Sequence, residues 1–311
     1  AKGNKAKYFI SATEGYHGKT LGALSLTDTE NFSEGFHVGL PKENTIKIDY
    51  NNIQSYKDKI LELSKEKIIA IIVEPIQGQI VEVAKKNYLK EICEISNQNN
   101  IIVIFDEIKC GLGRSGNLFS FLDDDCVPDI ITTSKALGGG KNAISAMIAR
   151  KKLFNKAYGS INKSTLHTTT FFGLGEACAT AIETLNIISD EKFLEVIKKK
   201  SQFTFQELDK LKDKYPKYIK SIKGKGLFIG IEFDFDNIIS NILFKKIKIP
   251  FIKNIKTVLM GAIVREFLHE HKILLQFNNS QPETLVFLPP LIISQEEIIT
   301  FIEATKKILE K

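Results

Sequence analysis

The sequence has few cysteines and lacks the features of several protein classes. Its cysteines, Cys93, Cys110, Cys126 and Cys178, form no CxxC pair and have no metal-ligand spacing with the five histidines. We therefore expect reduced thiols in a cytoplasmic protein and no metal site. No apolar run is near the roughly 18 residues that a membrane helix needs, so no membrane span is expected.

The sequence also lacks a concentrated basic patch, although its formal net charge is +6. Lysines are spread through helix-like stretches such as 198–200 and 210–220, without interleaved aromatic residues. A nucleic-acid footprint would be clustered on one surface, so we interpret these lysines as solvated helix faces. With 43% hydrophobic and 26% charged residues, the composition is that of a globular chain long enough for a large and a smaller domain.

The N-terminal residues AKGNKAKYFISA contain neither an initiator methionine nor the apolar region of a signal peptide. They are typical of the end of a helix that leads into a strand. We therefore expect the sequence to begin inside a longer protein.

Short β-branched runs alternate with longer helical stretches over the first part of the chain. Strands are predicted at Tyr8–Ala12, Ile68–Val73, Ile101–Phe105, Ile130–Thr133 and Ser145–Ala149. Helices are predicted at Lys86–Gln98, from Glu176 to Ile188, and over about Lys192–Lys212. Continuous apolar strands separated by helices are typical of a mostly parallel sheet with helices on both faces, so the predicted fold class is α/β.

The pattern changes near residue 220. We predict one strand over 221–233 after a glycine turn, a helix over 256–271, and a short strand over 285–288 that Pro289-Pro290 ends. A final amphipathic helix is predicted over Gln295–Lys311 with Ser294 as its N-cap, while 236–256 has an ambiguous period and is left unassigned. These features predict a large domain at 1–219 and a smaller α+β domain at 220–311.

Polar residues follow three of the predicted strands. They are Glu74, the pair Asp106-Glu107, and Ser134-Lys135 with the glycines 138–140 just beyond. In an open parallel sheet, ligands bind beyond the carboxyl ends of the strands. An acid and a lysine at neighbouring strand ends are also compatible with a structural ion pair, but three such ends together favour a site.

The sequence resembles the class III aminotransferases of the pyridoxal-phosphate fold type I superfamily. Seven matching segments occur in the family's order and cover nearly the whole chain: EGYHGKTLGALSLT (14–27), IIVEPIQG (71–78), IFDEIKCGLGRSGNLFSF (104–121), PDIITTSKALGGG (128–140), LHTTTFFGLGEACATAIETL (166–185), IKGKGLFIGIEF (222–233) and FLPPLII (287–293). The resemblance implies pyridoxal 5'-phosphate as cofactor, held by the large domain, an amine donor and a keto-acid acceptor as substrates, and a homodimer.

The resemblance also implies roles for individual residues. Lys135 would hold the cofactor as a Schiff base and then move the proton, which suits a lysine whose pKa is lowered beside the cofactor. Asp106 would keep the pyridine nitrogen protonated, so that the ring remains an electron sink. Ile108 and Tyr16 would pack on opposite faces of the ring, and His17 completes the turn that presents Tyr16.

Three further roles are assigned by the same resemblance. Thr170 would donate to the cofactor phosphate, in the family from across a dimer interface. Glu74 would brace the hydrogen-bond network from its strand end. Arg114, in GLGRSG, is interpreted as a structural loop residue.

The sequence departs from the family pattern at four places. The phosphate-binding segment at a helix N-terminus, where free backbone N–H groups meet the anion, would lie before residue 1. Lys109 occupies the position of a glutamine that reaches the cofactor's phenolic oxygen. Gln79 stands where a glutamate often follows the QG pair, and Val286 stands where a carboxylate-binding arginine is expected. The acid and the arginine that it would neutralise are thus both replaced.

Three hypotheses follow. The first is a transaminase that moves an amino group from an amine or ω-amino donor, with a diamine-like donor favoured by the LHTTTF segment, to a keto acid. The second is a catalytically degenerate or truncated homologue that acts as a non-enzymatic interaction module. The third is an aminomutase or another pyridoxal-phosphate lyase on the same fold, which would not depend on a second keto-acid substrate.

Overall fold

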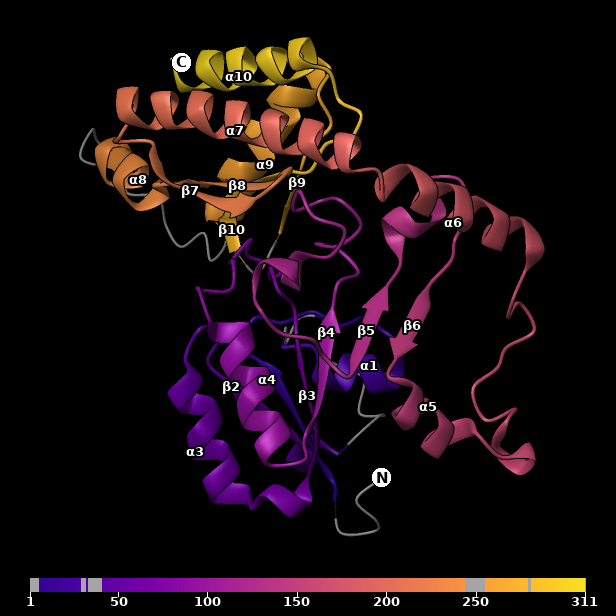
Figure 1. Ribbon diagram of the computed structural model, residues 1–311. Helices are drawn as coiled ribbons and strands as arrows, with labels where there is room; N and C mark the ends of the chain where they lie inside the picture. The colour runs from indigo at the N-terminus through magenta and orange to yellow at the C-terminus, as the bar shows by residue number, and fades with distance from the viewer. Residues whose placement is uncertain (1–5, 29–31, 33–40, 244–254, 279–280, 311) are drawn as a thin grey trace. The chain divides into compact units, whose positions relative to one another are not determined.

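The computed structural model describes residues 6–28, 32, 41–278 except 244–254, and 281–310, with no side-chain detail at 240–243. The chain forms two compact units (Figure 1). The first runs up to Phe193, and the second comprises Leu194 onward together with Gln79–Val83 and Arg114–Gly116. The second unit thus receives two short loops from the first half of the chain.

A six-stranded sheet forms the centre of the first unit, in the order β2-β1-β3-β4-β5-β6. Its strands are β1 (Tyr8–Ala12), β2 (Thr45–Ile48), β3 (Ile68–Val73), β4 (Ile102–Asp106), β5 (Ile130–Thr133) and β6 (Ala146–Ala149). β1 to β5 pair in parallel, and β6 is antiparallel to β5. The predicted α/β fold with a mostly parallel sheet is therefore confirmed.

Helices cover this sheet because the central strands are apolar on both faces. The helices of this unit are α1 (Leu21–Leu26), α3 (Ile53–Leu63), α4 (Tyr88–Gln98), α5 (Lys151–Tyr158) and α6 (Gly175–Ile188). Ile71 on β3 and Phe105 on β4 are completely buried, and Leu89 and Ile92 of α4 pack into the same core cluster. Burial of both sheet faces explains why the strands are continuous apolar runs.

The second unit has a four-stranded antiparallel sheet in the order β7-β8-β10-β9. Its elements are α7 (Glu191–Lys214), β7 (Ile219–Lys225), β8 (Phe228–Phe233), α8 (Phe235–Leu243), α9 (Ile255–His271), β9 (Gln276–Asn278), β10 (Gln281–Phe287) and α10 (Gln295–Leu309). Figure 1 shows α7 and α10 side by side, and Tyr215, just after α7, donates a hydrogen bond of 2.6 Å to Glu310. α7 thus belongs with the second unit, whereas the sequence placed a domain boundary after residue 219.

The predicted single strand over 221–233 is wrong, because a tight turn divides it into the hairpin β7–β8. Gly226 lies in this turn with φ of 65°, and a Cβ there would lie 2.1 Å from the carbonyl oxygen of Arg114. The turn therefore requires glycine at this position. The unassigned stretch 236–256 contains α8, and its residues 244–254 lie outside the described part of the chain.

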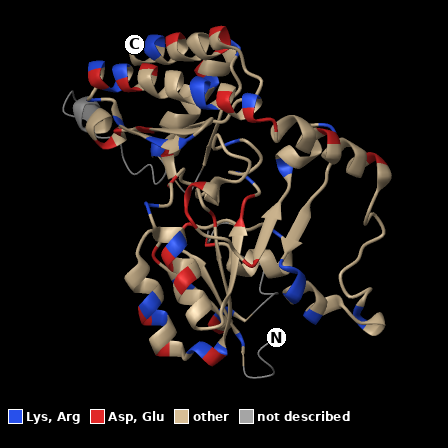
Figure 2. Cartoon of the chain, viewed as in Figure 1, with Lys and Arg blue, Asp and Glu red and all other residues tan. Residues whose placement is uncertain are grey.

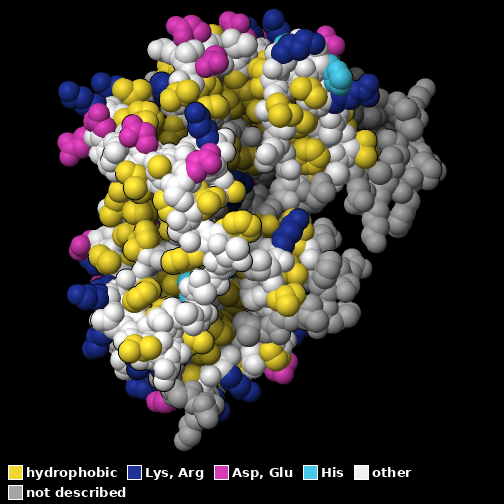
Figure 3. Space-filling view, turned by 90° about the vertical axis from the view of Figure 1, so that its right-hand side faces the viewer, with side chains coloured by type: hydrophobic (Ala, Val, Ile, Leu, Met, Phe, Trp, Pro, Cys, Tyr) yellow, Lys and Arg dark blue, Asp and Glu magenta, His cyan; other side chains and the backbone are white. Residues whose placement is uncertain are grey.

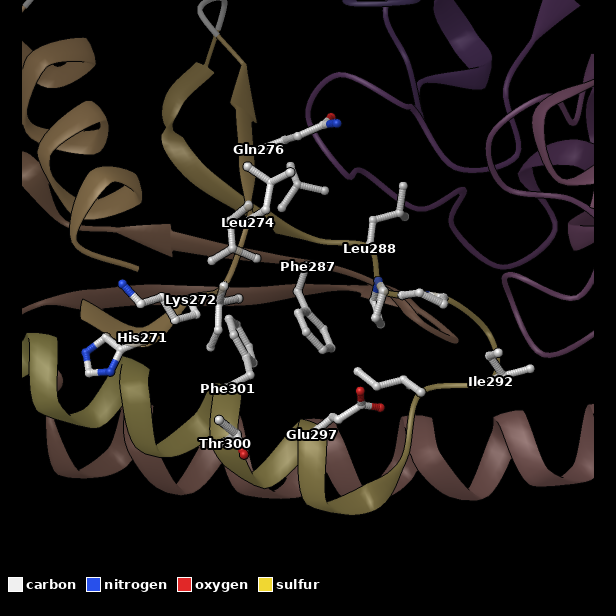
Figure 4. Close-up of a pocket in the computed structure, with 16 residues that line it drawn as sticks. His271, Lys272, Leu274, Gln276, Phe287, Leu288, Ile292, Glu297, Thr300 and Phe301 are labelled. Atoms are coloured by element: carbon white, nitrogen blue, oxygen red, sulfur yellow. The ribbon is translucent and has the colours of Figure 1, made fainter. Parts of the chain in front are cut away.

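The final helix begins as predicted. Ser294 Oγ accepts the backbone N–H of Glu297 at 3.1 Å, and the Glu297 carboxylate accepts the N–H of Ser294 at 2.7 Å, which forms a capping box. Inside this unit, the Phe287 and Phe301 rings stack at 4.1 Å and border an apolar pocket of about 650 Å³ (Figure 4). Val286 also lines this pocket.

Charged side chains of both signs occur along α7 and α10 (Figure 2). On α7, ion pairs three residues apart join Lys198 to Glu195 at 3.4 Å and Lys210 to Glu207 at 2.6 Å. The lysine-rich sequence of α7 is therefore a solvated face with paired charges. In the described part of the chain, no helix has the length and apolarity needed to cross a membrane.

Candidate active site

The parallel sheet brings the predicted site residues to one edge. β1, β3, β4 and β5 are consecutive neighbours, so the loops after their carboxyl ends lie along the same side of the sheet. Asp106 is the last residue of β4 and is in register with Thr132 of β5. Lys135 follows three residues after Thr132, while Glu74 follows β3 and Tyr16 follows β1.

Asp106 and His17 form a buried pair. Asp106 is 4% exposed, and its Oδ2 lies 2.9 Å from Nδ1 of His17, a distance at which the ring N–H donates to the carboxylate. Its Oδ1 accepts the backbone N–H of Ile108 at 3.1 Å. These contacts orient a carboxylate at the end of the central strand.

Glu74 ties two loops to the end of β3. Its two carboxylate oxygens accept the backbone N–H groups of Tyr16 at 2.9 Å and Gly78 at 2.8 Å. Burial raises the pKa of Glu74 to about 7, the electrostatic influence of His17 opposes this rise, and the Asp106 carboxylate adds to it. Glu74 therefore holds the Tyr16 loop in place, as a brace of the network would.

Glu107 is a buried acid to which the sequence assigned no role. It is completely buried, and its carboxylate accepts the N–H of Phe121 at 3.0 Å and the thiol of Cys110 at 3.2 Å. Burial raises its pKa to about 7, and the hydrogen bonds from Ser120 and Phe121 lower it in part. Glu107 thus binds the segment at 120–121 to the end of β4. In the sequence, only its position next to Asp106 indicated that Glu107 belongs to this part of the structure.

Lys135 lies at the start of a tight turn and has an exposed side chain. Its φ of 45° is a left-handed conformation, which costs a non-glycine residue about 1–3 kcal/mol. The surrounding loop is held by a hydrogen bond of 2.9 Å from the Ser134 hydroxyl to the carbonyl oxygen of Ile144. Gly139 lies close to α6, since a Cβ there would lie 2.7 Å from the hydroxyl of Thr184. The left-handed backbone at Lys135 and the hydrogen bond from Ser134 to Ile144 together fix the position of Lys135 in its loop.

The remaining predicted residues lie outside the buried cluster. Lys109 is half-buried, and its Nζ donates to the carbonyl oxygen of Gly78 at 2.5 Å. Thr170 belongs to the segment 159–176, which is exposed throughout. Gln79, whose side-chain oxygen accepts from Asn278, and Val286 in β10 both belong to the second unit.

The residues at the strand ends fit the chemistry of a pyridoxal-phosphate site. A buried, oriented carboxylate suits a protonated ring nitrogen, and a primary amine at the adjacent strand end suits a carbonyl carbon. His17 Nε2 is buried and has no hydrogen-bond partner among the described residues. A buried polar atom is usually hydrogen-bonded, so this nitrogen is available to a group that the described chain does not supply. Across the same described ranges, no group of three His, Cys, Asp or Glu side chains is arranged to hold a metal ion.

The fold and this edge define an α/β protein with a lysine and a buried aspartate at the ends of neighbouring parallel strands. The model of the aminotransferase class-III family matches residues 1–309, so the chain belongs to this family, whose members use pyridoxal phosphate.

Curated relatives are similar over much of the chain. An acetylornithine aminotransferase from Methanocaldococcus jannaschii is 31% identical over 312 aligned residues, which cover 98% of this chain and 67% of that protein. One from Clostridium acetobutylicum is 38% identical over 229 residues, 73% of this chain and 56% of that protein. The chain thus spans between about half and two thirds of the length of these relatives.

Solved structures of the same fold agree with this assignment. The ornithine aminotransferase from Toxoplasma gondii ME49 has a TM-score of 0.79 and 29% identity, over 99% of this chain and 66% of that chain. A structure described as a transaminase with L-ala has a TM-score of 0.82 and 27% identity, over 98% of this chain and 73% of that chain.

Proposed function

We propose that this chain carries the cofactor-binding and catalytic part of a pyridoxal-phosphate-dependent transaminase. The observation that carries the proposal is the pairing of Asp106 with His17 at the end of β4, with Lys135 at the end of the neighbouring strand β5. When bound, pyridoxal phosphate supplies an electron sink for the carbanion that forms at the substrate carbon.

The residues of this chain would divide the work as follows. Lys135 would hold the cofactor carbonyl through its amine and would move the proton at the substrate carbon. Asp106 would keep the ring nitrogen protonated, and His17 orients the Asp106 carboxylate. Ile108 and Tyr16 would hold the ring, and Thr170 would donate to the phosphate.

The proposed donor is an amine or ω-amino compound, with a diamine-like donor favoured, and the acceptor is a keto acid. Val286 is 6% exposed in β10, where its strand neighbours are Gly230 and Gln276, so neither this residue nor its two strand partners carries a charge to bind a donor carboxylate. Similar proteins include a putrescine aminotransferase from Pectobacterium atrosepticum, 31% identical over 311 residues, 99% of this chain and 61% of that protein.

The test is an absorption spectrum of the protein with added pyridoxal phosphate. We expect a visible imine band that borohydride reduction removes. Reduction should leave the cofactor covalently attached to the peptide that contains Lys135. Lys135→Ala should abolish the band, and Lys141→Ala, a change at an exposed lysine in the same loop, should retain it. Absence of the band in the natural full-length protein would overturn the proposal and favour a non-enzymatic interaction module.

A second measurement separates the donor classes. Putrescine, ornithine and N-acetylornithine are mixed in turn with the cofactor-loaded protein, and loss of the imine band is followed for each. A faster loss with putrescine supports the diamine-like donor. Turnover that needs no keto acid would instead indicate the aminomutase or lyase alternative.

We also propose that the protein is a homodimer. The segment 159–176 exposes large apolar side chains, with Leu166 69%, Phe171 77% and Phe172 71% exposed. Figure 3 views the side of the molecule that carries β6 and α5, where hydrophobic side chains are open to solvent. Apolar surface of this kind in a folded protein is typical of an interface with another subunit. Thr170 lies in this segment and would then act across the interface.

Sedimentation analysis tests the dimer. The unmodified protein should sediment as a dimer, and Phe171→Asp with Phe172→Asp should shift it to monomer. A matched change of the exposed Leu61 on α3, Leu61→Asp, should leave the dimer intact. A monomer at every concentration of the unmodified protein would overturn this proposal.

A further inference from the structure

Two cysteines that are far apart in the sequence meet on the first unit. Cys93 lies on α4, and Cys126 lies in the turn between Ser120–Asp123 and β5. Both are partly buried and pack against the same core cluster. The Cys126 thiol lies close enough to the Cys93 thiol to be the main cause of the raised pKa of Cys93. The fold thus creates a thiol pair that the spacing of the sequence does not reveal.

The surrounding contacts hold this pair together. Lys90, one helical turn before Cys93, forms an ion pair of 3.2 Å with Asp125, the residue before Cys126. Positions three apart on a helix share a face, so Lys90 and Cys93 both face the turn. Asp129, at the far end of the turn, accepts the backbone N–H of Val103 at 3.0 Å. The turn is therefore attached to α4 and to β4 on either side of Cys126.

The other two cysteines lack this combination of features. Cys110 is 1% exposed and donates to the carboxylate of Glu107, so it is closed to solvent. Cys178 lies on α6 and is partly buried, and no other cysteine lies on that helix. Of the four cysteines, Cys93 and Cys126 are the two that are partly exposed and also have another thiol nearby.

We propose that Cys93 and Cys126 are a reversible modification site that forms an intramolecular disulfide with a small-molecule disulfide such as oxidised glutathione. The Cys126 thiolate attacks the oxidant, whose S–S bond breaks to give a mixed disulfide and one glutathione thiolate. The Cys93 thiolate then attacks the Cys126 sulfur, and the second glutathione thiolate leaves. Two protein thiols are oxidised, one disulfide is reduced, and the two thiol protons pass to the two glutathione sulfurs.

The order of attack follows from the surroundings of the two thiols. The hydrogen bond with Cys126 and then burial raise the pKa of the Cys93 thiol, so Cys93 is the poorer first nucleophile. It acts second, when the mixed disulfide is already beside it. The contact between the two thiols then favours an intramolecular bond over a lasting glutathione adduct.

The disulfide would join α4 to the turn that precedes β5, the strand that leads to Lys135. It would close the loop from Cys93 to Cys126, and a closed loop stabilises a protein mainly by restricting its unfolded chain. Oxidation should therefore raise the melting temperature of the protein. The inference does not depend on the proposed transaminase activity.

The test equilibrates the whole chain in buffers of increasing oxidised-to-reduced glutathione ratio, blocks free thiols with N-ethylmaleimide, and maps peptides by mass. We expect a linked peptide pair containing Cys93 and Cys126 that dithiothreitol separates, and a melting temperature raised by roughly several degrees. Cys126→Ser and Cys93→Ser should each remove the redox dependence of melting, and the control Cys178→Ser should retain it.

Three outcomes would overturn the proposal. They are a lasting glutathione adduct on Cys126 without a linked pair, a link between two chains, and thiols that remain alkylated at every ratio. The mapping of the unmodified chain decides the matter even if a serine variant does not fold. A linked pair with an unchanged melting temperature would overturn the stabilising effect.

Discussion

Replacement of Glu107 by glutamine measures how much the ionisation of one buried carboxylate destabilises this fold. Glu107 is completely buried, and burial raises its pKa to about 7 from an ordinary value of 4.5. Backbone N–H groups of Ser120 and Phe121 and the thiol of Cys110 stabilise the ionised form in part. Burial outweighs these hydrogen bonds, so ionisation of Glu107 disfavours the folded state.

The sign of the pH dependence follows from the two pKa values. Below pH 4.5 the carboxyl is protonated in both the folded and the unfolded chain, and its contribution to stability is fully present. Between pH 4.5 and about 7 the folded chain keeps a proton that the unfolded chain has lost, so the free energy of unfolding falls as pH rises. At about 1.4 kcal/mol per pH unit, the total loss is about 3 kcal/mol.

Urea unfolding of the cofactor-free protein, followed by far-ultraviolet circular dichroism from pH 5 to 8, tests this expectation. Glu107→Gln cannot ionise and keeps a carbonyl oxygen that can accept from Phe121. The free energy of unfolding of the unmodified protein, minus that of the variant, should fall by roughly 2–3 kcal/mol over this range.

A matched control is Glu94→Gln, which changes an exposed glutamate on α4. The free energy of unfolding of the unmodified protein, minus that of Glu94→Gln, should stay constant with pH. A constant difference for Glu107→Gln as well would refute the reasoning, because the buried carboxyl would then ionise alike in the folded and unfolded chains.

Other variants test other parts of the structure. Ser294→Ala, which breaks the capping box of α10, should lower the free energy of unfolding by about 1 kcal/mol in urea. Phe287→Ala, which removes the ring stacked on Phe301, should lower it by about 3–5 kcal/mol in the same assay. His17→Phe removes the donor to the Asp106 carboxylate, and should weaken pyridoxal-phosphate binding by roughly 10- to 100-fold in a fluorescence titration.

The sequence predicted the centre of the first sheet well, because buried strands are continuous apolar runs. β3 and β5 have the predicted bounds, and β4 is displaced by one residue. β2 was not predicted, since Thr45–Ile48 is a short edge strand with one buried residue and charged neighbours. β6 was placed nearly correctly, but its antiparallel direction depends on the path of the loop after Lys135, which composition does not specify.

The second unit was harder to predict because its shape depends on contacts between distant segments. The turn at Gly226 closes against Arg114, whose guanidinium donates to the carbonyl oxygens of Leu227 at 3.2 Å and Pro289 at 2.5 Å. The prediction that Arg114 is a structural loop residue agrees with these contacts. The three-residue strand β9 has too little sequence for any periodicity, and it was missed.

Polar residues at strand ends were enough to single out Glu74, Asp106 and Lys135. The contact between His17 and Asp106 was not predictable, because it depends on how the loop after β1 folds over the end of β4. The same holds for Glu107, whose burial depends on the segment at 120–121. The assignment of Thr170 still rests on the family resemblance, and its exposed position stays compatible with a role across a subunit interface.

The three carboxylates at this edge differ in what their hydrogen bonds do. Glu74 and Glu107 accept backbone N–H groups from neighbouring loops, and burial raises the pKa of each to about 7. Both can therefore keep their loops in place near neutral pH without two full charges at the strand ends. Asp106 differs, because a ring nitrogen of His17 faces its carboxylate directly. Asp106 thus faces a basic side chain, whereas Glu74 and Glu107 accept mainly from backbone N–H groups. This difference supports the proposal that Asp106 is the carboxylate that would hold a cationic ring nitrogen.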